Sequence, residues 1–283
     1  MRKFLTVSAL FLVLISPLAF AQFDNCETIS QRGGINSIPM QAGGLNAVAV
    51  LNTGILPIGI SRTLAESLGS EVQSVPSRNR VWSAIPAITG QVSDVPVRLF
   101  NQDLELEQMY VMDTPGEFAY LSLLMFDDFV IQMNLPQSQL CFLNRGAVNL
   151  KDTANLRMRM VQGRIAIQVA INQQDPVWVE LQLEYPGALR LNRDVAIALG
   201  LTREDDTATS GNIETLMFGP YELGNIAVAF PAAVPLTDNQ AALQRLGRRN
   251  GGLQTSGALG YEVLKHFVTT FDVQTERLNV YVP

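Results

Sequence analysis

The sequence predicts an all-β fold, mainly strands with short helices, built as two related lobes in tandem along 283 residues. Three observations support this prediction. Two blocks of sequence occur twice, in the same order and with similar separation. Most apolar stretches are short, and several alternate with polar residues as half-buried strands do. The helical patterns are short as well, and the clearest of them end in Leu-Gly.

The first repeated block pairs residues 60–69 with residues 191–200, and the second pairs residues 129–142 with residues 267–280. Both pairs align without a gap. The identical pairs are Arg62/Arg193, Ala65/Ala196, Leu68/Leu199, Gly69/Gly200, Phe129/Phe267, Val130/Val268 and Leu140/Leu278. Two matched blocks in one order predict an internal duplication.

Each copy shows the same order of elements. An apolar strand is followed by a short helix that begins at an N-cap residue and ends at glycine, and then by further strands, a second short helix and a terminal hairpin. The polar segment 145–155 separates the copies, so we divide the chain into a signal peptide (1–21), an N-terminal lobe (22–150) and a C-terminal lobe (151–283). The predicted strands include 46–51, 95–100, 105–112, 165–171 and 222–230, and the predicted helices are 61–68, 123–128, 192–199 and 261–266.

The N-terminus has the pattern of a cleavable secretory signal. Two basic residues precede an apolar run over residues 4–14, and the small-residue pattern Ala19-Phe20-Ala21 follows. The run is too short for a transmembrane anchor. We therefore expect cleavage after Ala21, export to the periplasm or secretion, and no later segment that spans a membrane.

The net charge of the mature chain limits the classes of partner to expect, and its two cysteines raise the question of a disulfide. After the signal is removed, 18 Lys and Arg (20 less the two in the signal) face 26 Asp and Glu, a net charge of −8. This charge argues against binding to nucleic acid phosphates. Cys26 and Cys141 are the only cysteines, and in an oxidising compartment they could pair and pin the N-terminus to the first lobe. Their Cα separation decides this, and the sequence leaves it open.

A glycine turn follows the first buried strand, at Asn52-Thr53-Gly54, and the Leu-Gly helix of residues 60–69 comes after it. In the second copy, residues 258–264 (Ala-Leu-Gly-Tyr-Glu-Val-Leu) lead into the terminal hairpin. With these motifs in this order, twice, the chain resembles bacterial pepsin/retropepsin-type aspartic proteases. The resemblance covers nearly all of the mature chain and implies two β-barrel lobes with a central cleft.

That family uses two aspartates, one from each lobe, which lie about 3 Å apart and share a proton. The resemblance places Asn52, Thr53 and Gly54 at the first acid turn, where an amide takes up no proton near neutral pH. Counting back from the second Leu-Gly helix puts Leu183 or Glu184 at the second acid position. Glu184 is a carboxylate, but its extra methylene and the inserted Tyr-Pro displace it, and small displacements cost catalysis dearly. We therefore interpret Asn52 and Glu184 as a degenerate acid pair.

The resemblance also implies a flap about thirty residues after the first acid. There Trp82 and Ser83 would contact an extended peptide that pairs by β-addition, and Tyr185 is the third predicted substrate contact. An ordinary, partly buried aromatic is the alternative interpretation of Trp82. Ser122 stands where the second copy has Gly260, which is consistent with an abandoned site.

Other chemistries find little support in the sequence. His266 is the only histidine, so it gives neither a nucleophile triad nor, with two distant cysteines, a zinc cluster. We expect no metal and no cofactor.

The function that we prefer from the sequence is not that of an enzyme. It is that of a monomeric two-lobed protein that binds an extended peptide or protein segment between its lobes or acts as a scaffold. The alternative is an active aspartic endopeptidase with a non-standard acid pair.

Overall fold

The computed structural model describes residues 26–32, 34–54, 58–75, 88–114, 116, 118–231 and 253–283. The predicted signal peptide (1–21) lies outside the described residues. The described part consists mainly of strands with short helices, which confirms the predicted all-β class. Within it, none of the helices has the length and apolar character needed to cross a membrane.

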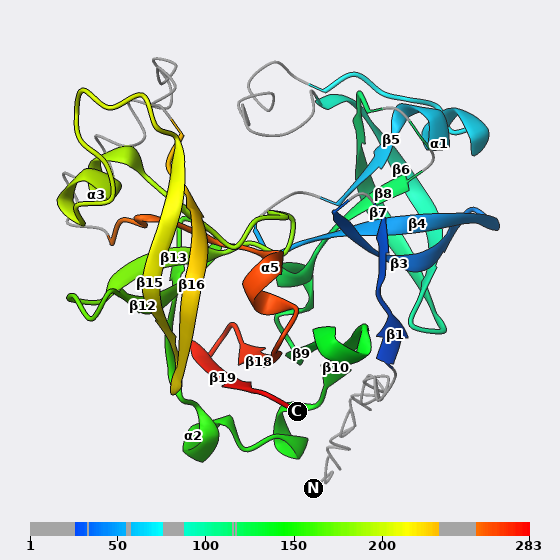
Figure 1. Ribbon diagram of the computed structural model, residues 1–283. Coiled ribbons are helices and arrows are strands. Elements are labelled where there is room, and N and C mark those ends of the chain that lie inside the picture. The colour runs from blue at the N-terminus through cyan, green and yellow to red at the C-terminus, as the bar shows by residue number, and fades with distance from the viewer. Residues whose placement is uncertain are drawn as a thin grey trace, which may run out of the picture.

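The strands form two hydrogen-bonded sheets (Figure 1). The smaller sheet contains, in spatial order, β2 (Ser30–Arg32), β3 (Ile35–Ala42), β4 (Leu45–Asn52), β8 (Phe118–Ser122), β5 (Gly59–Ser61), β7 (Gln102–Met112) and β6 (Ile88–Leu99). The larger sheet contains β1 (Cys26–Thr28), β10 (Gln139–Leu143), β9 (Val130–Asn134), β18 (Val268–Asp272), β19 (Arg277–Tyr281), β11 (Leu156–Val161), β12 (Arg164–Ile171), β13 (Val177–Leu181), β17 (Gly257–Leu259), β14 (Leu189–Leu191), β16 (Tyr221–Ala229) and β15 (Ser210–Phe218). The short helices are α1 (Arg62–Ser67), η2 (Leu123–Phe126), η3 (Leu135–Gln137), η4 (Arg145–Ala147), α2 (Leu150–Thr153), α3 (Arg193–Ala198) and α5 (Tyr261–Leu264).

Each of the predicted strands and helices named above is present, with ends that shift by a few residues. The main exception is β6, which begins at Ile88 rather than at 95 because its first half pairs with β7 despite a polar outer side. The polar segment 145–155 contains η4 and α2, two helical turns that its lack of periodicity did not predict.

The pairing scheme of the first half recurs in the second. In the first, β4 runs parallel to β8, while β5 is parallel to β7 and antiparallel to β8. In the second, β13 runs parallel to β17, while β14 is parallel to β16 and antiparallel to β17. The hairpins β9–β10 and β18–β19 also share one register, with Gln139 opposite Asn134 and Arg277 opposite Asp272.

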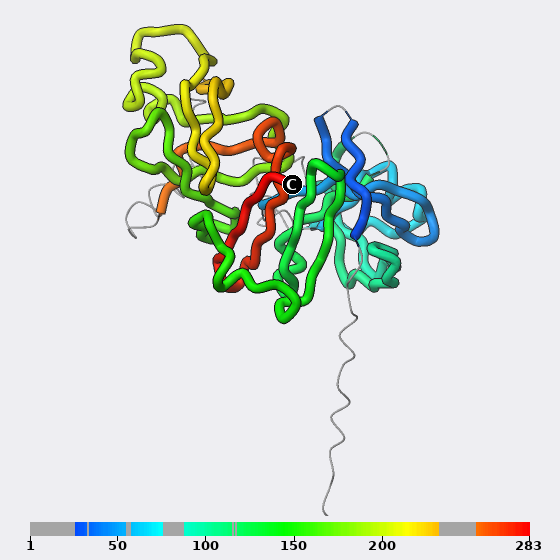
Figure 2. The backbone as a smooth tube through the Cα atoms, turned by 60° about the horizontal axis from the view of Figure 1, so that its bottom comes forward, coloured from blue at the N-terminus to red at the C-terminus, as the bar shows by residue number. Residues whose placement is uncertain are grey.

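The two halves are joined by their terminal hairpins. Strand β9 pairs antiparallel with β18, so the hairpins form one continuous sheet beneath the remaining strands of both halves (Figures 1 and 2). A disulfide joins Cys26 to Cys141, which lie opposite each other in β1 and β10 with a Cα separation of 4.2 Å, and this answers the question that the sequence left open. The start of the described chain is therefore fastened to this shared sheet.

The helices after β5 and β14 end alike but begin differently. The side chain of Ser61 accepts a hydrogen bond from Leu64 N at 3.1 Å, as an N-cap residue should, and Gly69 follows the helix with φ +64°. Asn192 occupies the N-cap position of α3 but forms no capping bond. Its amide instead donates to Thr255 O at 3.1 Å, because the chain that leads into β17 passes beside it. The predicted cap is therefore correct for Ser61 and not for Asn192.

Candidate functional site

The turn that follows β4 is closed by its own side chain. Asn52 is 7% exposed, and its Oδ1 accepts a hydrogen bond from Gly54 N at 2.6 Å. From the neighbouring strand β8, Ser122 Oγ donates to Gly54 O at 2.6 Å. Ser122 therefore has a positive role, holding the turn, where the sequence suggested only the loss of a glycine.

Thr53 connects this turn to the second half of the chain. Its side chain is buried, and its hydroxyl donates to Leu181 O at 2.6 Å and accepts from Leu183 N at 3.3 Å. These two backbone groups lie at the end of β13, 128 and 130 residues away along the chain. One buried hydroxyl thus satisfies a donor and an acceptor of the opposite half.

Glu184 lies against the same residue. Its Oε2 is 3.1 Å from Thr53 Oγ1 and 3.4 Å from Thr53 N. Because the single hydroxyl proton serves the shorter bond to Leu181 O, the amide of Thr53 is the donor to this carboxylate. The structure therefore brings Asn52, Thr53, Gly54 and Glu184 together in one junction between the halves.

The strand registers, however, make Gln182 the equivalent of Asn52. Asn52 lies opposite Ser122 in the β4–β8 pairing, and extending the β13–β17 register by one residue sets Gln182 opposite Gly260. Ser122 and Gly260 correspond in the repeat, so the residues facing them correspond too. Both side chains are amides, and Gln182 is 8% exposed.

This position differs from the predicted Leu183 or Glu184 for a simple reason. Nine positions separate Gln182 from the start of the repeated block at Leu191, whereas eight separate Asn52 from Ile60. Counting back eight positions from Leu191 therefore stops at Leu183, one residue short of Gln182. The pairing of β13 with β17, rather than any count along the sequence, identifies Gln182 as the equivalent residue.

A charged network surrounds Gln182 and includes residues that the sequence did not single out. Gln182 Nε2 donates to Glu180 Oε2 at 2.5 Å, and Arg190 Nη2 donates to Gln182 Oε1 at 2.9 Å. Glu180 also pairs with Arg164 at 3.4 Å and accepts from Thr255 Oγ1 at 3.1 Å. Arg164 in turn forms a backbone bridge with Gly54, so the network borders the Asn52–Gly54 turn.

Tyr185 packs beneath this network. The guanidinium of Arg190 lies 5.0 Å from the centre of its ring. Burial raises the pKa of the Tyr185 phenol, and the nearby positive charge of Arg190 opposes part of that rise. Gly260 approaches so closely that a methyl group there would overlap the Tyr185 ring and backbone. Tyr185 therefore supports the junction, and it also lines a hollow of about 410 Å³ beside β14–β16.

Glu184 also lines a cavity of about 230 Å³. Its walls come from the outward side of β3, β4 and β8, where several apolar side chains remain partly exposed. We call Ile35, Val48, Val50, Phe118 and Tyr120 the apolar face. Arg32, Asn36, Ser37, Leu51 and Glu184 complete the lining. Trp82 and Ser83, predicted to contact a substrate, lie outside the described residues.

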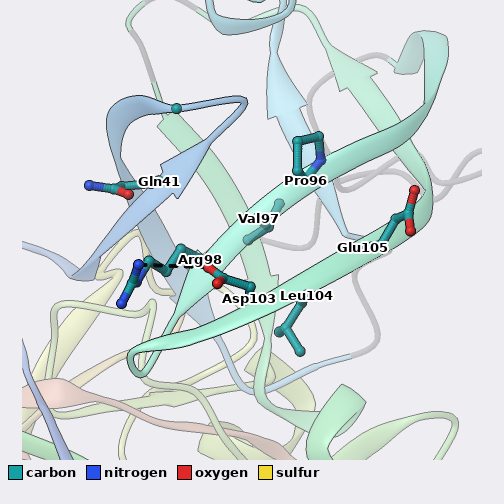
Figure 3. A pocket seen from close by; sticks show the side chains of 8 residues that line it. Gln41, Pro96, Val97, Arg98, Asp103, Leu104 and Glu105 are labelled. Carbon is teal, nitrogen blue, oxygen red and sulfur yellow. Dashed lines mark ion pairs between the residues drawn. The ribbon is translucent and has the colours of Figure 1, made fainter.

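A further hollow, of about 520 Å³, lies away from the junction, between β3 and the β6–β7 hairpin (Figure 3). Arg98 and Asp103 form an ion pair of 3.8 Å within it, and both side chains are exposed. Exposed pairs contribute little to stability. None of the predicted site residues lines this hollow.

No protein-family model and no curated protein match the chain. Solved structures do. Basic 7S globulin from soybean is similar over 91% of this chain and 94% of its own, with a TM-score of 0.49 and 9% sequence identity. A retropepsin-like aspartic protease from Rickettsia conorii is similar over 45% of this chain and 90% of its own, with a TM-score of 0.30 and 14% identity.

Proposed function

We propose that this protein is an exported, non-catalytic relative of two-lobed aspartic proteases that binds an extended peptide or protein segment where its two β halves meet. The observation that carries the proposal is the pair of buried amides, Asn52 and Gln182, at equivalent strand ends. The recurring pairing scheme supports descent of both halves from one duplicated unit.

The chemistry of hydrolysis supports the non-catalytic half of the proposal. Two acids must share one proton, so that one activates water while the other polarises the peptide carbonyl. Amide side chains supply neither function. Glu184 contributes one carboxylate, but its Oε2 lies against the amide and hydroxyl of Thr53, and one acid alone cannot share a proton. The site therefore keeps the junction and lacks the dyad.

The apolar face supports the binding half of the proposal. Ile35 and Val48 are 52% and 43% exposed, although they adjoin a cavity with mostly apolar walls. Exposed apolar side chains that gather at a concave site are typical of binding surfaces. Burying one aliphatic side chain of a bound segment there would contribute about 1.5–3 kcal/mol.

Export is proposed on two independent grounds. The N-terminal sequence has the pattern of a secretory signal. The bond between Cys26 and Cys141 is of a kind that persists in oxidising compartments and is rare in the cytosol of mesophiles.

Binding can be tested with fluorescein-labelled, unfolded casein as the probe, followed by fluorescence anisotropy. We expect casein to bind the wild type, and Val48→Asp to weaken the binding about tenfold, since a charge replaces an apolar contact. Val282→Asp is the matched control, because Val282 is also exposed (53%) but lies at the C-terminal end, away from the cavity. Equal binding by the two variants, or no binding by the wild type, would contradict the proposal.

A further inference from the structure

The two halves present different chemistry on equivalent sides of their sheets. Ser37 lies opposite Val50 in the first half, and Ala166 lies opposite Glu180 in the second. Gly59 lies opposite Tyr120 in the β5–β8 pairing, and Arg190 lies opposite Ala258 in the β14–β17 pairing. Since Tyr120 and Ala258 correspond in the repeat, Gly59 is the counterpart of Arg190. The equivalent outward positions are therefore Ile35 and Arg164, Val50 and Glu180, and Gly59 and Arg190.

We call Arg164, Glu180 and Arg190 the charged face. These side chains are partly exposed, while the residues that alternate with them along the strands are buried in the core. At the equivalent positions the first half has Ile35 and Val50, which belong to the apolar face, and Gly59. The junction is thus apolar on one side and ionic on the other.

The charged face carries one positive charge in excess. Glu180 is already engaged by Arg164, Gln182 and Thr255. Arg190, in contrast, has no carboxylate partner within the described ranges, where its polar contact is the neutral Gln182 and its ring contact is Tyr185. A guanidinium has five N–H donors in a planar fork that suits a carboxylate, and one hydrogen bond to Gln182 leaves most of them available.

The apolar face and Arg190 are linked through one loop. Glu184 lines the cavity, and the next residue, Tyr185, packs against the Arg190 guanidinium. The cavity and the Arg190 guanidinium therefore adjoin consecutive residues of this loop. Tyr185 and Gln182 hold the guanidinium in place, which lowers the cost of ordering it on binding.

From this arrangement we infer that Arg190 selects a carboxylate of the bound segment, next to the apolar side chain that enters the cavity. The inference rests on the proposed function and names its ligand class: an apolar residue beside an acidic group. That group is an acidic side chain or the C-terminal carboxylate of a peptide, and the chemistry that Arg190 recognises is the same for both.

The test uses fluorescein-labelled ten-residue peptides of one extended sequence, each with Phe followed by a variable residue and with an amidated C-terminus. The variable residue is Glu, Gln or Lys. A fourth peptide stops at the Gln with a free C-terminus, which separates a terminal carboxylate from a side chain. We expect the Glu peptide or the free-terminus peptide to bind about tenfold more tightly than the amidated Gln peptide, and the preference to weaken as salt is raised.

Variants assign the preference to one residue. Arg190→Gln should reduce the preference for a carboxylate-bearing peptide over the amidated Gln peptide to less than about twofold. Arg190→Lys should retain part of this preference because the charge remains. Arg190→Glu should instead favour the Lys peptide. Arg157→Gln, at an exposed position of β11, is the control and should leave it unchanged.

Two failures are distinguishable. If the peptides bind but wild type does not discriminate among them, or if Arg190→Gln keeps the preference, the inference is wrong and the proposed function stands. If no peptide binds at all, the proposed function fails and the inference fails with it. Melting curves show whether a variant has folded, and Arg190→Lys provides a second measurement should Arg190→Gln not fold.

Discussion

Replacing Thr53 with valine removes one hydroxyl from the junction of the two halves and keeps the shape of the side chain. The hydroxyl donates to Leu181 O at 2.6 Å and accepts from Leu183 N at 3.3 Å, in a position that is 1% exposed. Valine leaves both backbone groups without this partner and away from water. Thr53→Val should therefore destabilise the link between the first turn and the end of β13.

The expected magnitude follows from the two lost partners. Each unsatisfied buried polar group costs about 1–3 kcal/mol, so Thr53→Val, which leaves two such groups, should lower the free energy of unfolding by about 2–6 kcal/mol. Thr53→Ser keeps the hydroxyl and loses one methyl group, which costs about 0.8 kcal/mol by the transfer of a buried carbon. The difference between the variants isolates the hydrogen bonds.

Urea unfolding of the three proteins at neutral pH measures these free energies. Hydrogen exchange at the Leu183 amide adds a local measurement, since this N–H is bonded to Thr53 Oγ1. We expect faster exchange in Thr53→Val and little change in Thr53→Ser. If Thr53→Val unfolds within about 0.5 kcal/mol of wild type and Leu183 exchanges as before, the hydroxyl does not hold the halves together.

Three further predictions concern the rest of the chain. Cys26→Ser should lower stability by about 2–5 kcal/mol, because the disulfide spans 115 residues; an unchanged urea midpoint would refute this. Gly257→Ala should cost about 3 kcal/mol or more, since its methyl would overlap the backbone of β14, whereas Gly146→Ala has open space around it and should stay within about 0.5 kcal/mol. A hydrogen bond from Met160 N lowers the pKa of Glu276 below its ordinary 4.5, with partial opposition from burial. The stabilisation it gives is complete above pH 4.5 and is lost as the pH falls through the lowered pKa. Glu276→Gln should therefore show a smaller decline in melting temperature over that range, and equal declines would contradict the assignment.

Much of the fold could be predicted from the sequence because its signals are local. Apolar periodicity located β4 and β12, and the Leu-Gly endings located α1 and α3. The alignment of residues 129–142 with 267–280 anticipated two hairpins of one register. What it did not anticipate is that β9 pairs with β18, since pairing between strands far apart in sequence depends on how the two halves pack, and no local pattern records it.

Part of the site was predictable because it too has a local sequence signal. Asn52, Thr53 and Gly54 form a recognisable turn motif, and the structure places Glu184 beside them. Gln182 was missed because one additional residue lies between it and the helix from which the position was counted. Arg164 and Arg190 were missed because each is an isolated charge in an apolar strand. They become neighbours of the junction through sheet register alone.

We propose that the buried amides Asn52 and Gln182 leave the junction able to bind a peptide and unable to cut it. The direct measurement is the digestion of unfolded casein by purified protein from pH 3 to 7, with and without a pepstatin-like inhibitor. We expect casein to stay intact at every pH, with the wild type as with Glu184→Gln. Cleavage that the inhibitor blocks, and that Glu184→Gln abolishes, would contradict it and show an active endopeptidase with a non-standard acid.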